Sequence, residues 1–316
     1  MSAPLFQRVP RLLFALGCLA LAPFFAHAAQ ADDPWAGLKD RLARDGFDRA
    51  ELDQAFAHEA MAYNPGVMAR KMNTLLRIKM KVYTHKPKAE DGKEKVQAPY
   101  VYADFLTPYA LNKARRYMDT HPDRLASVQK KYGVPPEIMT ALLLVETGFG
   151  TNLGKHSAFA VLASMAASGD VDEIRDHIKP PEPLTPSLKS YLKKRTLQKS
   201  NWAYEELKAL LNYAQMLEIK SGDIPGSIYG AIGICQFMPT NVLAYGADGD
   251  DDGVIDLFVK ADAVHSMANF LKKNGWRPKM SRSRQLKVIY RYNQSWRYTN
   301  TIMAVADELK EEDKGR

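Results

Sequence analysis

One glutamate stands out because of the residues that precede it. Glu146 follows a run that is apolar around nearly the whole helix circumference, Ile138 to Val145, and residues 147–150 (TGFG) then end that helix. A helix that is apolar on every side belongs in the protein interior. Ionising a carboxyl at its end is therefore costly, and its pKa should rise. A carboxyl that stays protonated near neutral pH can act as a general acid. The alternative is that Glu146 emerges into solvent or pairs with a nearby lysine or arginine.

A second segment has the composition of a ligand-binding turn. Residues 227–239 (SIYGAIGICQFMP) are apolar, interrupted by glycines, and end with an amide, an aromatic ring and a thioether. Glycine lets the backbone approach a ligand closely, and the amide of Gln236 can hold a hydroxyl or another amide. Taken alone, the segment is also typical of a tightly packed buried turn.

The third candidate is an acidic loop, residues 248–256 (DGDDDGVID). Aspartates occupy its positions 1, 3, 5 and 9 (Asp248, Asp250, Asp252 and Asp256), glycine occupies position 6, and Val254 would offer its carbonyl at position 7. This pattern is the first half of an EF-hand loop, in which hard oxygens surround Ca²⁺. The twelfth position is valine rather than glutamate, so the motif fails there. The alternative is a solvated acidic turn, but carboxylates this close together repel one another unless a cation is present.

The elements that would position these residues are helices. Apolar periodicity predicts helices over residues 35–44, 107–131 and 201–219, and another after Tyr292. Asp48 and Glu51 form a capping box that begins a further helix. Residues 84–99 and 178–188 are charged and contain prolines, which predicts exposed loops. Alternating strand patterns are scarce, so the predicted class is mainly α.

Composition excludes several classes of protein. The chain has 316 residues, 44 Lys+Arg against 36 Asp+Glu, and only two cysteines. It therefore has no disulfide scaffold, iron–sulfur cluster or cysteine-rich zinc site. It also lacks the glycine-rich nucleotide motifs, the HExxH motif of zinc proteases and the GxSxG motif of serine hydrolases.

The first residues are typical of a secretory signal peptide. Two arginines precede an apolar stretch from Leu12 to Phe25, and Ala26-His27-Ala28 offers a cleavage site. A retained membrane anchor or lipidation at Cys18 are the alternatives. Cleavage after residue 28 would leave 42 basic and 36 acidic residues, a net charge of 42 − 36 = +6. An exported protein with this charge suits a polyanionic partner such as the cell wall better than nucleic acid, because the basic residues are scattered.

Taken together, these segments resemble the lytic murein transglycosylase B family. The resemblance lies in residues 135–155, 227–240, 249–258, 267–276 (MANFLKKNGW) and 292–298 (YNQSWRY). It implies a lysozyme-like catalytic core, which we expect over residues 100–316 with the cation-binding loop at 248–262. The predicted signal peptide (1–28) and an N-terminal helical region with a linker (29–99) precede this core. The resemblance also implies cleavage of the β-1,4 bond between MurNAc and GlcNAc in peptidoglycan without water, leaving a 1,6-anhydro-MurNAc end in the periplasm.

The same resemblance assigns roles to individual residues. Glu146 takes the position of the family's single catalytic acid and base. The implied glycan-binding residues are Ser227, Gln236, Phe237, Met238, Tyr292, Asn293 and Tyr298, with Tyr102 as a looser match. Family members with an EF-hand-like loop have the same lengthening, so Asp262 is expected to complete a structural Ca²⁺ site with Asp248, Asp250, Asp252 and Val254. No organic cofactor is expected, and the implied partners are glycan strands and proteins of cell-wall synthesis or remodelling.

Two other functions are compatible with parts of this pattern. One is a calcium-dependent peptidoglycan-binding or assembly protein that does not cut its ligand. The other is a true hydrolase, which would leave reducing MurNAc ends. The first has no need of a protonated carboxyl at Glu146, and the second differs in its product.

Overall fold

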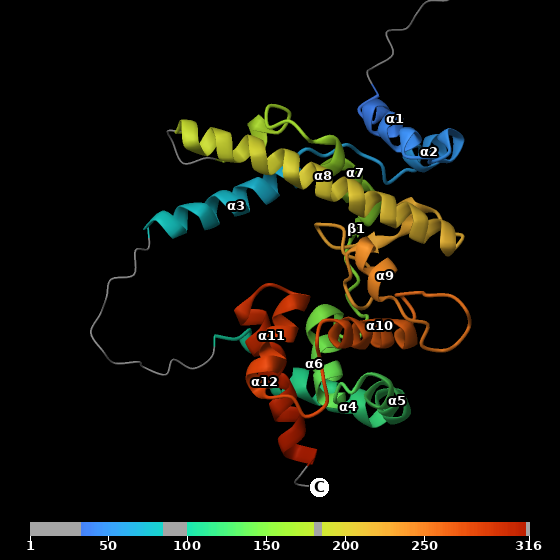
Figure 1. The fold of residues 1–316 in the computed structure, drawn as a ribbon, viewed down its shortest axis with the longest axis vertical. Helices are drawn as coiled ribbons and strands as arrows, with labels where there is room; N and C mark the ends of the chain where they lie inside the picture. The colour runs from blue at the N-terminus through green and yellow to red at the C-terminus, as the bar shows by residue number, and fades with distance from the viewer. Residues whose placement is uncertain (1–32, 85–99, 180–184, 314–316) are drawn as a thin grey trace, which may run out of the picture. The chain divides into compact units, whose positions relative to one another are not determined.

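Helices make up nearly all of the regular structure in the computed structural model, which describes residues 33–84, 100–179 and 185–313 (Figure 1). The chain divides into two units, Met1–Asp33 and Pro34–Arg316, and every described element belongs to the second. The predicted signal peptide lies outside the described residues, as do residues 85–99 of the predicted loop. The mainly α prediction is confirmed.

The elements follow one another along the chain as helices with two very short strands. They are α1 (Ala36–Arg44), α2 (Arg49–Phe56), α3 (Gly66–Thr84), η1 (Ala103–Leu106), α4 (Pro108–Thr120), α5 (Pro122–Tyr132), α6 (Pro136–Thr147), β1 (His156–Ser157), α7 (Ala158–Ala167), η2 (Arg175–His177), α8 (Pro186–Met216), η3 (Ser221–Asp223), β2 (Pro225–Gly226), α9 (Pro239–Tyr245), α10 (Lys260–Lys273), α11 (Arg282–Tyr292) and α12 (Trp296–Asp313). The strands pair antiparallel, with His156 opposite Gly226.

Helix α6 lies inside the protein, as its sequence predicts. It packs against α4, α5, α10 and α12, which surround it in Figure 1. Every residue from Ile138 to Leu144 is buried. Removing a leucine side chain of this kind from water contributes about 1.5–3 kcal/mol, so tertiary packing holds this helix more than its intrinsic propensity does.

The N-terminal helices pack on a second group of elements. Helix α3 contacts α7 and α8, and α1 contacts α7. The predicted cap of α2 is confirmed, since the Asp48 side chain accepts a hydrogen bond from the Glu51 backbone N–H at 2.9 Å. These contacts join helices that precede residue 99 to helices that follow residue 100, across the predicted domain boundary. That boundary stays a prediction.

Two predicted helix boundaries were wrong. The helix expected over 107–131 is two helices, α4 and α5, because Pro122 cannot continue the hydrogen-bond pattern of the first and instead begins the second. The helix expected over 201–219 begins much earlier, at Pro186, where Thr185 caps its first turn. Charged side chains on the exposed face of residues 186–200 conceal a buried stripe that includes Leu192, Thr196 and Ser200.

Within the described ranges, no helix is both long enough and apolar enough to cross a membrane.

Candidate active site

Glu146 lies on the last turn of α6, and the backbone after it turns sharply. Gly148 adopts a left-handed conformation (φ +57°), and the N–H groups of Gly148 and Phe149 donate to the carbonyls of Leu144 and Leu143, both at 3.0 Å. Only glycine adopts this conformation without strain. The Lys113 ammonium donates to the Gly148 carbonyl at 2.9 Å, placing a positive charge at the negative end of the helix dipole.

The Glu146 carboxyl is in the environment that its sequence predicts. The side chain is half-buried, and burial raises its pKa from 4.5 to about 7. The Tyr298 hydroxyl donates a hydrogen bond to its Oε1 at 2.5 Å, which opposes the rise because it favours the ionised form. The alternative of a pairing cation is wrong, since no ion pair involves Glu146 in the part of the chain that the structure describes. The carboxyl is therefore poised to exchange a proton near neutral pH.

A tight turn lies beside the end of α6. Ile232 and Phe237 exchange two backbone hydrogen bonds, and residues 233–236 form the turn between them. A Cβ at Gly233 would lie 2.5 Å from the Leu257 Cβ, so only glycine fits there. Gln236 is in the left-handed region (φ +49°) although it is not glycine, a conformation that costs about 1–3 kcal/mol. Backbone strain of this kind is often found at ligand-binding sites.

Hydrogen bonds join this turn to the surrounding helices. The Thr147 hydroxyl, next to Glu146, donates to the Ile234 carbonyl at 2.9 Å and accepts from the Gly150 N–H. The Tyr292 hydroxyl donates to the Cys235 carbonyl at 2.6 Å. The rings of Tyr292 and Tyr298 are stacked, with centroids 6.4 Å apart. The turn, the end of α6 and the two tyrosines therefore form one connected site.

The structure corrects the role of two predicted glycan contacts. Phe237 is only 1% exposed and packs against Tyr245, Phe270 and Tyr292, so its ring supports the site from the core. Tyr298 is only 4% exposed, and its hydroxyl is bonded to Glu146. Its position in the motif did not reveal that its hydrogen-bond partner is the Glu146 carboxyl.

The other predicted glycan contacts differ in how far their side chains are exposed to solvent. Gln236 and Met238 are half-buried in or beside the turn, and Asn293 is exposed at the end of α11. The Ser227 hydroxyl accepts hydrogen bonds from the N–H groups of Tyr229 and Ala231, which shapes the preceding loop. The Tyr102 ring packs on the Arg297 guanidinium at 4.1 Å. Glycan contact by these residues stays a prediction.

Sequence reasoning missed two residues that fix the site. Thr147 ties Glu146 to the turn, and Lys113 caps the helix end from α4. The position of Thr147 between the glutamate and a glycine was the available signal. Lys113 gave none, since an isolated lysine on a helix is usually solvated.

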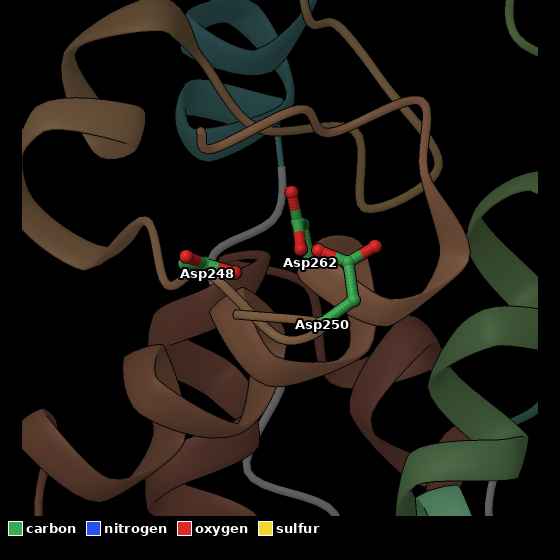
Figure 2. Close-up of side chains that lie close together, drawn as sticks. All are labelled: Asp248, Asp250 and Asp262. Carbon is green, nitrogen blue, oxygen red and sulfur yellow. The ribbon is translucent and has the colours of Figure 1, made fainter. Parts of the chain in front are cut away.

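The acidic loop brings three of its predicted carboxylates together. Oxygens of Asp248, Asp250 and Asp262 lie within 4.8 Å of one another, and Figure 2 shows these side chains converging. Oxygens that share one Ca²⁺ at about 2.4 Å lie within about 5 Å of each other, so the donor set and its spacing fit this cation. Asp252 is outside the group, and its Oδ1 accepts from the Val254 N–H at 2.8 Å. Asp262 is buried and accepts from the N–H groups of Gly249 and Asp256, which closes the loop.

Comparison with known proteins agrees with this geometry. A family model described as a transglycosylase SLT domain matches residues 30–287. Membrane-bound lytic murein transglycosylase B of Escherichia coli (strain K12) is 25% identical over 232 residues, which are 73% of this chain and 54% of that protein. The chain thus spans just over half the length of this curated relative.

Solved structures share the fold. The E. coli lytic transglycosylase Slt35 in complex with calcium matches with a TM-score of 0.63 and 20% identity, covering 89% of this chain and 93% of that one. SltB3 from Pseudomonas aeruginosa in complex with NAG-NAM-pentapeptide matches with a TM-score of 0.61 and 18% identity, covering 87% of this chain and 79% of that one. These matches confirm the expected lysozyme-like fold class. Because the family model covers most of its length, the chain belongs to the transglycosylase SLT domain family.

Proposed function

We propose that this protein is a lytic transglycosylase that cuts the β-1,4 bond between MurNAc and GlcNAc in peptidoglycan without adding water. The observation that carries the proposal is the Glu146 carboxyl, whose pKa is raised to about 7 by burial and which accepts a hydrogen bond from Tyr298. A glycan-binding protein would have no use for a carboxyl that exchanges protons at neutral pH.

In the first step Glu146 acts as the acid. Tyr298 occupies Oε1, and Oε2 has no hydrogen-bond partner among the described residues, so Oε2 is the oxygen that presents the proton. The proton passes to the glycosidic oxygen as the bond from that oxygen to C1 of MurNAc breaks. GlcNAc leaves with a new hydroxyl, and the N-acetyl group of MurNAc stabilises the positive charge at C1.

In the second step Glu146 acts as the base. Its carboxylate takes the proton of the C6 hydroxyl while that oxygen forms a bond to C1, which closes the 1,6-anhydro ring. The carboxyl regains the proton that it gave, and no water is consumed. Between the two steps the hydrogen bond from Tyr298 stabilises the carboxylate, so a single carboxyl can serve both roles.

The substrate assignment rests on the site and on the relatives together. A murein transglycosylase from E. coli shares sequence with this chain over 232 residues, and SltB3 was solved with a glycan carrying a pentapeptide. Gln236, Met238, Tyr292 and Asn293 line or flank the turn beside Glu146 and are proposed to hold the sugars. Peptidoglycan glycan strands are therefore the proposed substrate.

The acidic loop is proposed to hold a structural Ca²⁺. Asp248, Asp250 and Asp262 would supply carboxylate oxygens, and Asp252 and the Val254 carbonyl would join after a small rearrangement of the loop. The cation would offset the mutual repulsion of these carboxylates. The loop follows the 233–236 turn in the chain, and the Ile234 N–H donates to the Leu257 carbonyl at 2.9 Å, so a filled loop would steady that turn.

Export to the periplasm follows from the predicted signal peptide and from the location of the proposed substrate. The relative from E. coli is named as membrane-bound. For this chain, cleavage after residue 28 remains our proposal.

Mass spectrometry of digested sacculi tests the reaction. The wild type should release muropeptides with 1,6-anhydro-MurNAc ends, lighter by one water than the hydrolytic products. Glu146→Gln should lose turnover by at least about 10³-fold while still binding glycan, and Glu137→Gln, at the other end of the same helix, should keep its activity. Reducing ends would indicate a hydrolase, and undiminished cleavage by Glu146→Gln would eliminate the mechanism.

A further inference from the structure

Two helices that pack together carry only positive charges over a long stretch. Helix α3 has five lysines and arginines and no acid, and residues 186–204 of α8 likewise have five and no acid. The two helices are in contact, with α3 beside the N-terminal half of α8 in Figure 1. Like charges in this number repel one another and destabilise the fold, so a bound anion would stabilise this surface.

Three of these cations are half-buried and close to one another. They are Lys71 on α3 and Arg195 and Lys199 on α8. Burial lowers the pKa of Lys71, and the charges of Lys199 and Arg195 lower it further. The pKa of Lys199 is lowered by burial and by Arg195. An anion placed among them would relieve this repulsion.

Their partners in the protein are aromatic rings and neutral groups. The Lys71 ammonium lies 4.2 Å from the Tyr229 ring centroid, and that of Lys199 lies 4.8 Å from Trp202. Arg195 donates to the Gln198 side chain, and its Nε is buried without a hydrogen-bond partner. None of the three cations forms an ion pair with a carboxylate within the described ranges.

A hollow adjoins this basic surface, because it is lined by Arg70, which precedes Lys71, and by Ile228, which precedes the Tyr229 that Lys71 contacts. It has a volume of about 290 Å³ and is lined by Arg70, Lys155 and His156, with no acid among its lining residues. Ile228, which is 41% exposed, also lines it. Ile228 and Tyr229 belong to the loop shaped by Ser227, a few residues before Gln236.

We propose that this hollow and the adjoining cations Lys71, Arg195 and Lys199 form a subsite for the carboxylates of the stem peptide carried by the glycan strand. This inference rests on the proposed function. Lysine and arginine side chains bind carboxylates through charge-assisted hydrogen bonds, and the exposed Ile228 offers an apolar contact for the small side chains of such a peptide.

The position of the surface favours a peptide on the bound strand over another anion. Lys71 is in direct contact with Tyr229, so the cations adjoin the loop that leads to the proposed sugar site. A peptide attached to MurNAc at that site would extend toward them. A hollow that combines basic and apolar side chains suits a short acidic peptide better than a phosphate group.

Steady-state kinetics on matched substrates test the subsite. The substrates are glycan strands with intact stem peptides, the same strands with the peptide carboxylates converted to amides, and strands stripped of peptide. For the wild type, amidation should raise KM about tenfold and leave kcat unchanged. This comparison needs no variant, so it does not depend on the folding of one.

The double variant Lys71→Gln and Lys199→Gln should show the same rise in KM on intact strands and no change on stripped strands. Lys193→Gln, which removes an exposed charge from the same helix, is the matched control and should behave as the wild type does. An equal effect of the double variant on intact and stripped strands would overturn the proposal, as would no effect of amidation. Loss of binding to phosphatidylglycerol vesicles, with strand kinetics unchanged, would assign the surface to membranes and overturn it too.

The stripped strands separate this inference from the proposed function. If the wild type cuts them to anhydro ends and the cation variants leave every substrate unaffected, only the peptide subsite fails. If the wild type yields no anhydro ends from any strand, the proposed reaction itself fails.

Discussion

The Tyr298 hydroxyl donates a 2.5 Å hydrogen bond to Oε1 of Glu146. Burial raises the pKa of the carboxyl, and this hydrogen bond lowers it. The value of about 7 is therefore a balance between the two effects. The role proposed for Glu146, first as an acid and then as a base, needs such a balance, because a pKa far from the working pH would impair one of the two steps.

Removing the hydroxyl should shift this balance in a known direction. In Tyr298→Phe the pKa of Glu146 should rise above 7, because only burial then acts on it. The alkaline limb of kcat/KM should therefore move to higher pH. The maximal rate should fall about 10- to 100-fold, because the ionised Glu146 carboxyl loses its hydrogen bond from Tyr298. A pH–rate profile measures both, with Tyr290→Phe as control. An alkaline limb that stays at the same pH would show that Tyr298 does not affect the pKa of Glu146.

Glu146 should make the protein less stable as pH rises. Its pKa is 4.5 in the unfolded chain and about 7 in the folded one, so the folded state binds more protons between these values. Wild-type stability should fall through this window, and Glu146→Gln, which cannot ionise, should be more stable by roughly 2–3 kcal/mol above pH 7. The difference should vanish near pH 4. Denaturant unfolding at several pH values measures it, and a constant difference would contradict the linkage.

Replacing Gln236 with glycine should raise the stability of the protein and lower its activity. Gln236→Gly relieves the left-handed strain and should stabilise the fold by about 1 kcal/mol, yet it removes the amide proposed to hold the glycan. We expect a higher Tm together with a kcat/KM at least about tenfold lower. Gln236→Asn, which tolerates the same conformation, should keep part of the activity. A lower Tm for the glycine variant would refute the strain argument.

Calcium should stabilise the protein through the acidic loop. At a concentration 100 times its dissociation constant, Ca²⁺ adds about 2.7 kcal/mol to the free energy of unfolding. Calorimetry in CaCl₂ and in EDTA should show a higher Tm with calcium for the wild type and for the control Asp176→Asn, and a smaller shift for Asp250→Asn. An equal shift in both variants would place the cation elsewhere.

The parts of the site that depend on local sequence were predicted well. The apolar run before Glu146 and the glycines after it are neighbours in the chain, and together they determine a buried helix with a carboxyl at its end. The spacing of Asp248 and Asp250 likewise predicts their approach. Periodicity and caps suffice where one helix or one loop decides the outcome.

The parts that depend on distant contacts could not be read from the sequence. Tyr298 and Glu146 are 152 residues apart, and nothing in either segment indicates the direction in which the tyrosine points. Phe237 stands between half-buried neighbours, and only the packing of α10 and α11 decides that its ring faces the core. The start of α8 at Pro186 could not be predicted, because lysines between residues 186 and 200 interrupt the apolar periodicity of its buried face.

The separation of Tyr298 from Glu146 also bears on when the protein becomes competent during its own synthesis. The carboxyl is synthesised first, and the hydroxyl that lowers its pKa follows 152 residues later, in α12. Until α12 has emerged from the ribosome and docked on α6, the nascent polypeptide lacks this hydrogen bond to Glu146. The hydrogen-bonded pair that holds the pKa of Glu146 near 7 can therefore form only after both helices have been made.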